Sequence, residues 1–332
     1  MKWTAAVVIG LALLGALGPG AGSEARAQGL AKWKMGVVFL KADSAFQLMG
    51  RERGYAREMG LDVEVVALPG DAQALQGLIA GHVDAVEITP AGPLAAMEKG
   101  AKLKIVASFM PGLAHVLYVR KEVEGLRDLY GKPVAVSALG SLPHVVVVAL
   151  LEKHGLDAKR LTWVQAGGDA DRLRALLAGK VMGTVSTVEF LPMIQRSGQA
   201  KLLMAMRDEL PEWPRNAAIA NDRAYTERAG LLQMALNAQA KGIRFAVEHK
   251  DETVALMAKL GKVEPKEVDW LYDWFVKNKT MQPNGYLRPE AIQWTQELNL
   301  KLKRQTRILP MEQVATWEFQ QRLVAELGTY PW

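Results

Sequence analysis

Cysteine is absent from all 332 residues of the chain. This absence excludes disulfide bonds, thiolate metal sites and cysteine nucleophiles. It also excludes the lipid anchor of a bacterial lipoprotein, which is attached to a cysteine at the cleavage point. The sequence has no nucleophile elbow and no Walker phosphate loop, and its five histidines are scattered without metal-ligand spacing. We therefore expect a protein that is not an enzyme and that holds no metal and no cofactor.

Long hydrophobic runs are also missing, except near the N-terminus. There, Lys2 precedes an apolar run over residues 5–17, which is followed by a Gly18-Pro19-Gly20 break and the small-residue site Ala25-Arg26-Ala27. This order is typical of a secretory signal peptide, and 13 apolar residues are fewer than the ~20 that span a bilayer. We predict that residues 1–27 are removed and that the mature protein is periplasmic, without stable membrane insertion.

The excess of basic residues is modest, with a formal net charge of +6. Lys and Arg are scattered along the chain, and no basic run with interleaved aromatic residues is present, so we expect no nucleic-acid partner. A basic surface would favour an anionic solute, or it would simply keep the protein soluble. Both interpretations stay open at this point.

Short β-branched runs alternate with amphipathic helical stretches from Met35 onward, which is typical of parallel sheets with crossover helices. The first strand is predicted at residues 35–40. A helix is predicted at residues 45–59, with Asp43 or Ser44 as its N-cap and Gly60 as its stop. After Ala224 the pattern is almost entirely helical. The helices predicted there span residues 231–246, 251–260, 265–276, 289–302 and 311–327.

An internal repeat is the most informative feature. Residues 70–89 align without a gap on residues 168–187, which lie 98 positions later, and nine of the twenty positions match. Each copy has a loop, a helix, a glycine stop and a strand that ends in threonine. Two copies with so long a period do not make a solenoid. The repeat instead predicts two similar α/β lobes, and a mature chain of roughly 305 residues is also long for one core.

Two strands are predicted to cross between the lobes, at residues 116–119 and 217–220. Lobe 1 then comprises residues 28–115, and lobe 2 comprises residues 116–217. The chain returns to lobe 1 at residues 218–332, where we expect the C-terminal helices to pack.

Several segments resemble one known family. They are residues 75–88, 117–137, 140–141, 217–225 and 286–327. In their order and spacing they resemble the nitrate/taurine/sulfonate binding proteins of ABC importers (NitT/TauT, SsuA/THI5-like), a family that also includes binders of thiamine-pyrimidine precursors. The resemblance implies a type II periplasmic-binding-protein fold, in which two doubly wound α/β lobes are joined by two crossing strands around a ligand cleft. It also implies a monomer whose partners are a small-molecule solute and an ABC permease with its cytoplasmic ATPase.

Candidate ligand residues follow the strands, because ligands of open parallel sheets bind beyond the carboxyl ends of the strands. In the first lobe they are Ser44, Ala45, Phe46, Gly70, Asp71, Thr89 and Phe109. In the second lobe they are Gly140, Ser141, His144, Gly168, Asp169, Thr187 and Glu189. Several of these loops open helices, whose free N–H groups suit a sulfonate, nitrate or carboxylate.

Each candidate also has a purely structural interpretation. The two phenylalanines either stack on a planar solute or fill the core. His144 either donates to a bound anion or lies on the surface. Six residues either only cap helices or also line the ligand, and these are Ser44, Asp71, Thr89, Ser141, Asp169 and Thr187.

Two acidic residues argue against an anion. Glu87 and Glu189 would repel an anion if they faced the cleft, and they would prefer an amine, a pyrimidine N–H or a hydroxyl. Glu87 could instead pair with a cation such as Lys41. The alternatives are therefore a pyrimidine or aromatic solute and an exported enzyme that uses Glu87 or His144. A sensor partner that presents a ligand to a receptor would have the same sequence, so it is a further alternative.

Overall fold

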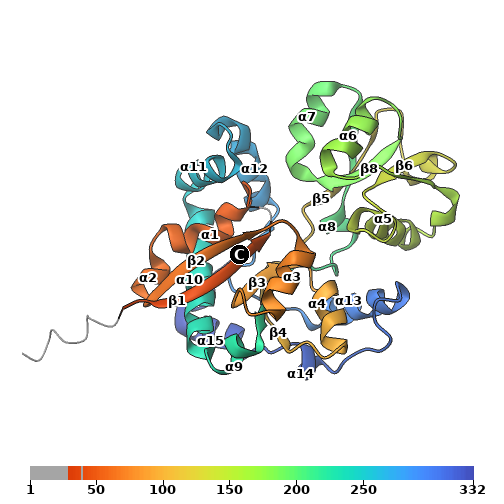
Figure 1. The fold of residues 1–332 in the computed structure, drawn as a ribbon. Helices are drawn as coiled ribbons and strands as arrows, with labels where there is room; N and C mark the ends of the chain where they lie inside the picture. The colour runs from red at the N-terminus through yellow and green to blue at the C-terminus, as the bar shows by residue number, and fades with distance from the viewer. Residues whose placement is uncertain (1–28, 39) are drawn as a thin grey trace, which may run out of the picture.

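A computed structural model of the chain describes residues 29–38 and 40–332. The predicted signal peptide, residues 1–27, lies outside this range. The described chain forms two lobes, each built around its own five-stranded sheet (Figure 1). None of the helices in the described ranges is both long enough and apolar enough to cross a membrane.

The two sheets have the same arrangement. The sheet of lobe 1 has the order β2-β1-β3-β10-β4, and that of lobe 2 has the order β7-β6-β8-β5-β9. In each sheet the first three strands are parallel and the fourth is antiparallel to them. The strands of lobe 1 are β1 (Ala31–Val38), β2 (Leu61–Leu68), β3 (Ala85–Ile88), β4 (Leu103–Met110) and β10 (Asn216–Asn221). Those of lobe 2 are β5 (His115–Arg120), β6 (Pro133–Val136), β7 (Thr162–Gln165), β8 (Gly183–Thr187) and β9 (Ala200–Ala205).

The sequence repeat coincides with equivalent parts of the two lobes. Its first copy forms α3 (Asp71–Ile79) and β3, and its second copy forms α6 (Asp169–Leu177) and β8. Both β3 and β8 are the central strands of their sheets. The prediction of two similar α/β lobes is therefore confirmed.

Two short links connect the lobes. The chain leaves β4 and enters β5 after residues 111–114, and it returns from β9 through α8 (Met206–Glu209) to β10. The two strands predicted to cross between the lobes are present as β5 and β10, but each lies within one sheet, and the crossing is made by the segment before it. Each is the antiparallel neighbour of the central strand of its sheet.

The N-terminal elements differ in detail from the prediction. Strand β1 begins at Ala31 rather than at residue 35 and ends at Val38. The single helix predicted at residues 45–59 is two helices, α1 (Ser44–Glu52) and α2 (Tyr55–Glu58). Gly54 separates them in the left-handed region, at φ 83°, a conformation that glycine adopts without steric cost.

A close helix contact anchors lobe 1. Helix α10 (Ala229–Glu248) crosses α1 where two glycines meet, Gly50 and Gly242. A Cβ at Gly50 would overlap the carbonyl group of Ala238, and a Cβ at Gly242 would overlap the backbone of Gly50. Backbone contact at this distance is possible only without side chains.

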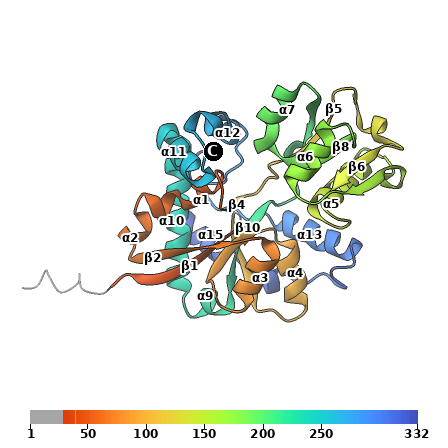
Figure 2. The same cartoon turned by 45° about the horizontal axis from the view of Figure 1, so that its top comes forward.

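The C-terminal helices pack on lobe 1, and they differ from the predicted helices in two respects. The helix expected at residues 311–327 is broken into α14 (Met311–Val314) and α15 (Glu318–Leu327), because Ala315 is extended and pairs with Ile105 of β4. In addition, α13 (Pro289–Lys301) contacts both lobes and lies beside α4 (Ala91–Glu98), beneath lobe 2 (Figure 2). The remaining helices are α5 (Leu142–Lys153), α7 (Leu191–Ser197), α9 (Asp222–Thr226), α11 (Lys250–Gly261) and α12 (Pro265–Lys277).

Candidate functional site

A cavity of about 370 Å³ lies between the lobes. Helices α3 and α4 of lobe 1 and helix α5 of lobe 2 all begin at its wall. The first backbone N–H groups of a helix have no partner within the helix, and the helix dipole adds partial positive charge there. The start of each helix is therefore suited to negative charge.

Four of the predicted ligand residues line this cavity. They are Asp71, Thr89, Gly140 and Ser141. The first two come from lobe 1 and the others from lobe 2, although up to 70 positions separate them in the sequence. The wall also includes Leu75, Leu142, Val145, Trp213, Leu298 and Arg304. Among the described residues that line it, Asp71 is the one acid and Arg304 the one base.

The predicted cap residues hold loops rather than cap helices. Ser141 occupies the N-cap position of α5 without a capping bond, and its hydroxyl donates to the carbonyl of Ala138 at 2.6 Å. Ser44 Oγ accepts a hydrogen bond from the backbone N–H of Lys41 at 3.2 Å. Burial raises the pKa of Asp71, and hydrogen bonds from Thr89 offset only part of this effect.

The second-lobe candidates have similar roles. Thr187 Oγ1 donates to Glu189 Oε2 at 3.1 Å, at the start of a short 3-10 turn. Asp169, which follows Gly168 at the start of α6, accepts hydrogen bonds from Arg172 and Ser186. These bonds stay within lobe 2. Gly70 and Gly168 precede α3 and α6, and as glycines they have no side chain that could contact a ligand.

His144 supports the loop at Gly140. The backbone N–H of Gly140 donates to His144 Nδ1 at 3.0 Å, and the histidine ring lies edge-on to Trp163. Burial lowers the pKa of His144, which keeps the ring neutral and its Nδ1 an acceptor. The Nδ1 atom is thus engaged within lobe 2 and does not donate to an anion.

Three candidates lie in the core of lobe 1. Ala45, Phe46 and Phe109 have no exposed surface. The ring of Phe46 stacks on Tyr272 with centroids 5.9 Å apart and meets Phe275 edge-on at 5.8 Å. The placement of both phenylalanines supports a role in the core, because neither ring reaches the cavity wall.

A chain of four alternating charges joins the lobes beside the cavity. Arg215 donates to Asp43, Lys41 Nζ lies 3.6 Å from Asp43 Oδ2, and Lys41 also donates to Glu189 Oε2 at 3.1 Å. Burial favours the neutral form of Asp43, but the charges of Lys41 and Arg215 outweigh it and lower the pKa of this carboxyl. Two positive and two negative charges cancel, so this cluster adds no net charge to the cleft.

Three buried polar atoms near this cluster have no hydrogen-bond partner among the described residues. They are His115 Nδ1, Glu189 Oε1 and Arg215 Nη1. Burial and the nearby cations lower the pKa of His115 to about 3, so its ring is neutral. Sequence reasoning missed Arg215 and His115. The available signal was their position at the two crossings, one or two residues before a predicted strand.

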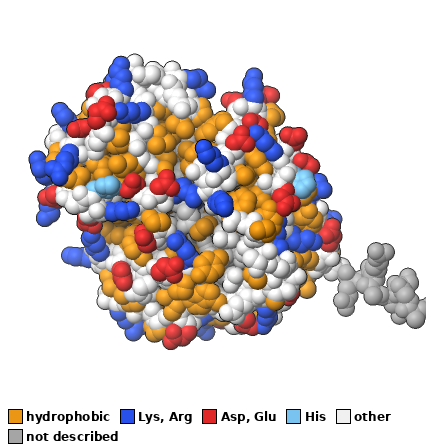
Figure 3. Space-filling model, turned by 180° about the vertical axis from the view of Figure 1, so that it is seen from behind, with side chains coloured by type: hydrophobic (Ala, Val, Ile, Leu, Met, Phe, Trp, Pro, Cys, Tyr) orange, Lys and Arg blue, Asp and Glu red, His pale blue; other side chains and the backbone are white. Residues whose placement is uncertain are grey.

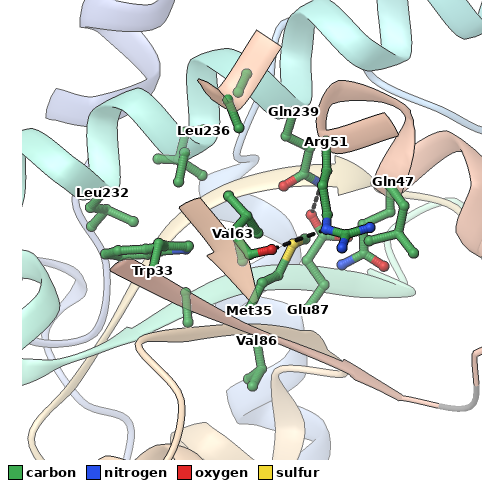
Figure 4. Close-up of a pocket in the computed structure, with 16 residues that line it drawn as sticks. Trp33, Met35, Gln47, Arg51, Val63, Val86, Glu87, Leu232, Leu236 and Gln239 are labelled. Atoms are coloured by element: carbon green, nitrogen blue, oxygen red, sulfur yellow. Dashed lines mark hydrogen bonds between the residues drawn. The ribbon is translucent and has the colours of Figure 1, made fainter. Parts of the chain in front are cut away.

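Glu87 lies outside the cavity between the lobes. It points into a separate pocket inside lobe 1, between the sheet and α10, where Gln239 donates to its Oε1 (Figure 4). Burial raises the pKa of Glu87 to about 7. The suggested pair with Lys41 is wrong, because Lys41 binds Glu189 and Asp43 instead.

A second hollow adjoins the charge cluster on its other side. It has a volume of about 600 Å³ and separates α7 of lobe 2 from α12 of lobe 1. Lys41 and Glu189 line it together with Phe190, Met193 and Trp270. On the face shown in Figure 3, basic side chains are scattered among acidic and apolar ones and form no single basic region. Within the described ranges, no group of three or more acidic or histidine side chains is placed to hold a metal ion.

Two sheets of identical strand order, with a cavity between them, define the periplasmic-binding-protein fold. A family model described as NMT1/THI5 like matches residues 41–253, and the chain belongs to this family. No curated protein matches the sequence significantly.

Solved structures share the fold at low sequence identity. The sulfonate-binding protein SsuA from Methylobacillus flagellatus KT has a TM-score of 0.71 and 17% identity, with 90% of this chain and 95% of that chain covered. The nitrate-binding protein NrtA from Synechocystis PCC 6803 has a TM-score of 0.67 and 14% identity, with 90% and 89% covered. The desulfurization enzyme DSZB has a TM-score of 0.64 and 14% identity, with 89% and 99% covered.

Proposed function

We propose that this chain is the periplasmic solute-binding component of an ABC importer and that its solute is a small anion, such as a sulfonate, a carboxylate or nitrate. The observation that carries the proposal is the cavity at which α3, α4 and α5 begin, because it combines helix N-termini from both lobes. Its volume of about 370 Å³ suits a small molecule. The structural neighbours named for sulfonate and nitrate binding support the same class of solute.

The two acids that argued against an anion have other roles. Glu189 is neutralised by Lys41, and Glu87 faces the interior of lobe 1. Asp71 is the acid that remains among the described residues lining the cavity, where burial raises its pKa. An anion at the helix N-termini therefore meets one acidic side chain rather than three.

The proposed mechanism is closure of two lobes around the solute. Lobe 1 comprises residues 28–115 and 218–332, lobe 2 comprises residues 116–217, and the short links between them serve as hinges. Closure replaces water with backbone N–H groups from both lobes, and the permease recognises the closed, monomeric form. Export through the signal peptide at residues 1–27 would place the protein in the periplasm.

A thermal-shift screen of the mature chain tests the choice of solute. The panel contains butanesulfonate, butyrate, nitrate, a pyrimidine and an aromatic acid. An anion at 100 times its Kd stabilises the folded state by about 2.7 kcal/mol, and small-angle scattering should then show compaction. Stabilisation by the pyrimidine alone, or compaction with none of the ligands, would contradict the proposal.

A second candidate is an aromatic or pyrimidine solute. The hollow lined by Phe190, Met193 and Trp270 favours it, because aromatic rings stack on planar ligands. Trp270→Ala distinguishes the two candidates. This change should leave the affinity for an alkyl anion unchanged, and it should weaken an aromatic solute held in the hollow.

Transport and catalysis are separated by two further measurements. Stimulation of the ATPase activity of a reconstituted ABC permease would support the importer role over that of a sensor partner. NMR spectra of the bound ligand over hours would reveal turnover if the chain were an enzyme. We expect stimulation and no turnover, and turnover that Glu87→Gln or His144→Gln abolishes would restore the enzyme alternative.

A further inference from the structure

Arg304 reaches the cavity from a part of the chain far from the strand-end loops. It follows α13, in the C-terminal segment that packs on lobe 1, and its backbone N–H donates to the carbonyl of Asn299 at 2.8 Å. Its guanidinium group donates to the carbonyl oxygen of Gly140 in lobe 2. Within residues 29–38 and 40–332, Arg304 is also the one basic side chain that lines the cavity.

Helix α13 places Arg304 by contacting both lobes at once. On the lobe 1 side, Asn299 Nδ2 donates at 2.7 Å to the carbonyl of Ala91, the first residue of α4. On the lobe 2 side, the ring of Trp294 lies 4.8 Å from that of Trp213, and Lys301 forms an ion pair with Glu152 of α5. The helix therefore joins the lobes in addition to the two links of the main chain and the Lys41–Glu189 ion pair.

The peptide groups around Gly140 are held from two sides. Its N–H donates to His144 within lobe 2, and its carbonyl accepts from Arg304 across the gap between the lobes. Gly140 adopts a φ of 79°, which other residues rarely tolerate. The guanidinium group of Arg304 is thus the contact from the C-terminal segment among the bonds that hold this loop, which leads into α5.

Arg304 also brings a basic group to this cavity, beside an ion-pair cluster whose charges cancel. The charges of Lys41 and Arg215 are cancelled by those of Asp43 and Glu189. A guanidinium group has five N–H donors in a planar fork, so one bond to Gly140 leaves further donors for the oxygens of an anion.

We propose that Arg304 is the residue that determines specificity for an anionic solute, because it binds the anion and clasps Gly140 of the opposite lobe at the same time. This inference rests on the proposed function and adds to it the residue that selects charge. Ligand charge and closure of the cleft are then coupled through one side chain.

Titration calorimetry on the mature chain tests the inference with three variants. The probes are butanesulfonate and its neutral counterpart butanesulfonamide, with the pair butyrate and butyramide as a second series. Arg304→Gln should weaken binding of the anion roughly ten- to a hundredfold, since hydrogen bonds to charged groups are the stronger ones. Arg304→Lys should recover part of this loss. The matched control is Arg307→Gln, a nearby exposed arginine that does not line the cavity.

The ratio of anion to neutral-analogue affinity separates charge selection from a structural role. We expect Arg304→Gln to reduce this ratio and Arg307→Gln to leave it unchanged. If the wild-type chain binds the anion and Arg304→Gln binds it equally well, the inference is wrong and the proposed function stands. An equal loss for the anion and its neutral analogue also overturns the inference. A wild-type chain that binds neither anion contradicts the proposed function itself, and the inference with it.

Discussion

Lys41 Nζ lies 3.1 Å from Glu189 Oε2, and this ion pair joins the two lobes across 148 residues of sequence. Lys41 belongs to the loop that follows β1, and Glu189 follows β8. Burial alone would lower the pKa of Lys41, but the carboxylates of Asp43 and Glu189 raise it instead. Lys41 is therefore charged at neutral pH, and its bond to Glu189 favours the arrangement in which the two lobes meet here.

Breaking this pair should loosen the closed state. Lys41→Gln leaves Glu189 without its cation, and Glu189→Gln leaves Lys41 with Asp43 alone. We expect each single variant to increase the radius of gyration without ligand. Because both side chains are partly exposed, we expect a coupling energy of about 1 kcal/mol in a double-mutant cycle of unfolding.

Lys201→Gln is the matched control for that experiment. Lys201 forms an ion pair with Glu124 at 3.3 Å, but both residues lie on the surface of lobe 2. Loss of the Lys201–Glu124 ion pair should change neither the scattering curve nor the coupling energy between Lys41 and Glu189. An unchanged radius of gyration in both single variants would show that the pair does not hold the lobes together.

Glu87 should make stability depend on pH. Its pKa is raised from 4.5 to about 7 in the folded protein, so the folded state binds the proton more tightly than the unfolded chain does. The resulting stability is fully present below pH 4.5 and is lost as the pH rises through 7. The difference corresponds to roughly 3 kcal/mol at most.

Glu87→Gln isolates this effect. Glutamine keeps an acceptor for Gln239 and cannot ionise. Subtracting the two curves of unfolding free energy against pH removes the opposite contribution of His115, whose lowered pKa raises stability between pH 3 and 6.5. The free energy of unfolding of the variant should rise relative to that of the wild type as the pH rises from 4.5 to 7. A pH-independent difference would mean that Glu87 titrates normally.

The glycine contact between α1 and α10 should not tolerate a methyl group. Gly50→Ala would force the backbones of the two helices apart, and we expect it to lower the free energy of unfolding by at least about 2 kcal/mol in urea denaturation. Gly77→Ala is the control, since a Cβ at this position in α3 meets nothing within 4 Å. It should instead stabilise the helix by roughly 0.5–1 kcal/mol. Similar effects of the two substitutions would contradict the close contact.

Serine substitutions test where the ligand binds. Ser141→Ala removes from the cavity wall a hydroxyl that holds the carbonyl of Ala138, and we expect the loosened loop to reduce affinity for the best anion three- to tenfold, measured by calorimetry. Ser44→Ala should have a smaller effect, because this hydroxyl holds the backbone of Lys41 and does not line the cavity. If both variants bound the anion like the wild type, the cleft would lie elsewhere.

The arrangement of the lobes could be predicted from the sequence because it depends on local pattern. Glycine stops, alternating apolar residues and the repeat at residues 70–89 and 168–187 are patterns of neighbouring residues, so they can be recognised in the sequence alone. The breaks at Gly54 and Ala315 were not predicted. The first is a glycine inside a helical pattern, and the second depends on pairing with Ile105, a long-range contact.

The candidate site could be predicted only in part. Asp71, Thr89, Gly140 and Ser141 share one cavity because strand ends gather at one edge of a parallel sheet. Phe46 and Phe109 follow the same rule in sequence, yet they point into the core, since the direction of a side chain depends on the residues packed around it.

The sequence by itself determined the duplicated α/β lobes and the loops that face each other. Only the tertiary structure decided how charge is distributed between them. Lys41 forms an ion pair with Glu189, and Glu87 accepts a hydrogen bond from Gln239. Arg304, in the C-terminal segment, donates a hydrogen bond to Gly140. Electrostatic interactions depend on distance and burial in space, and residues 148 or 164 positions apart carry no sign of their proximity in the linear sequence.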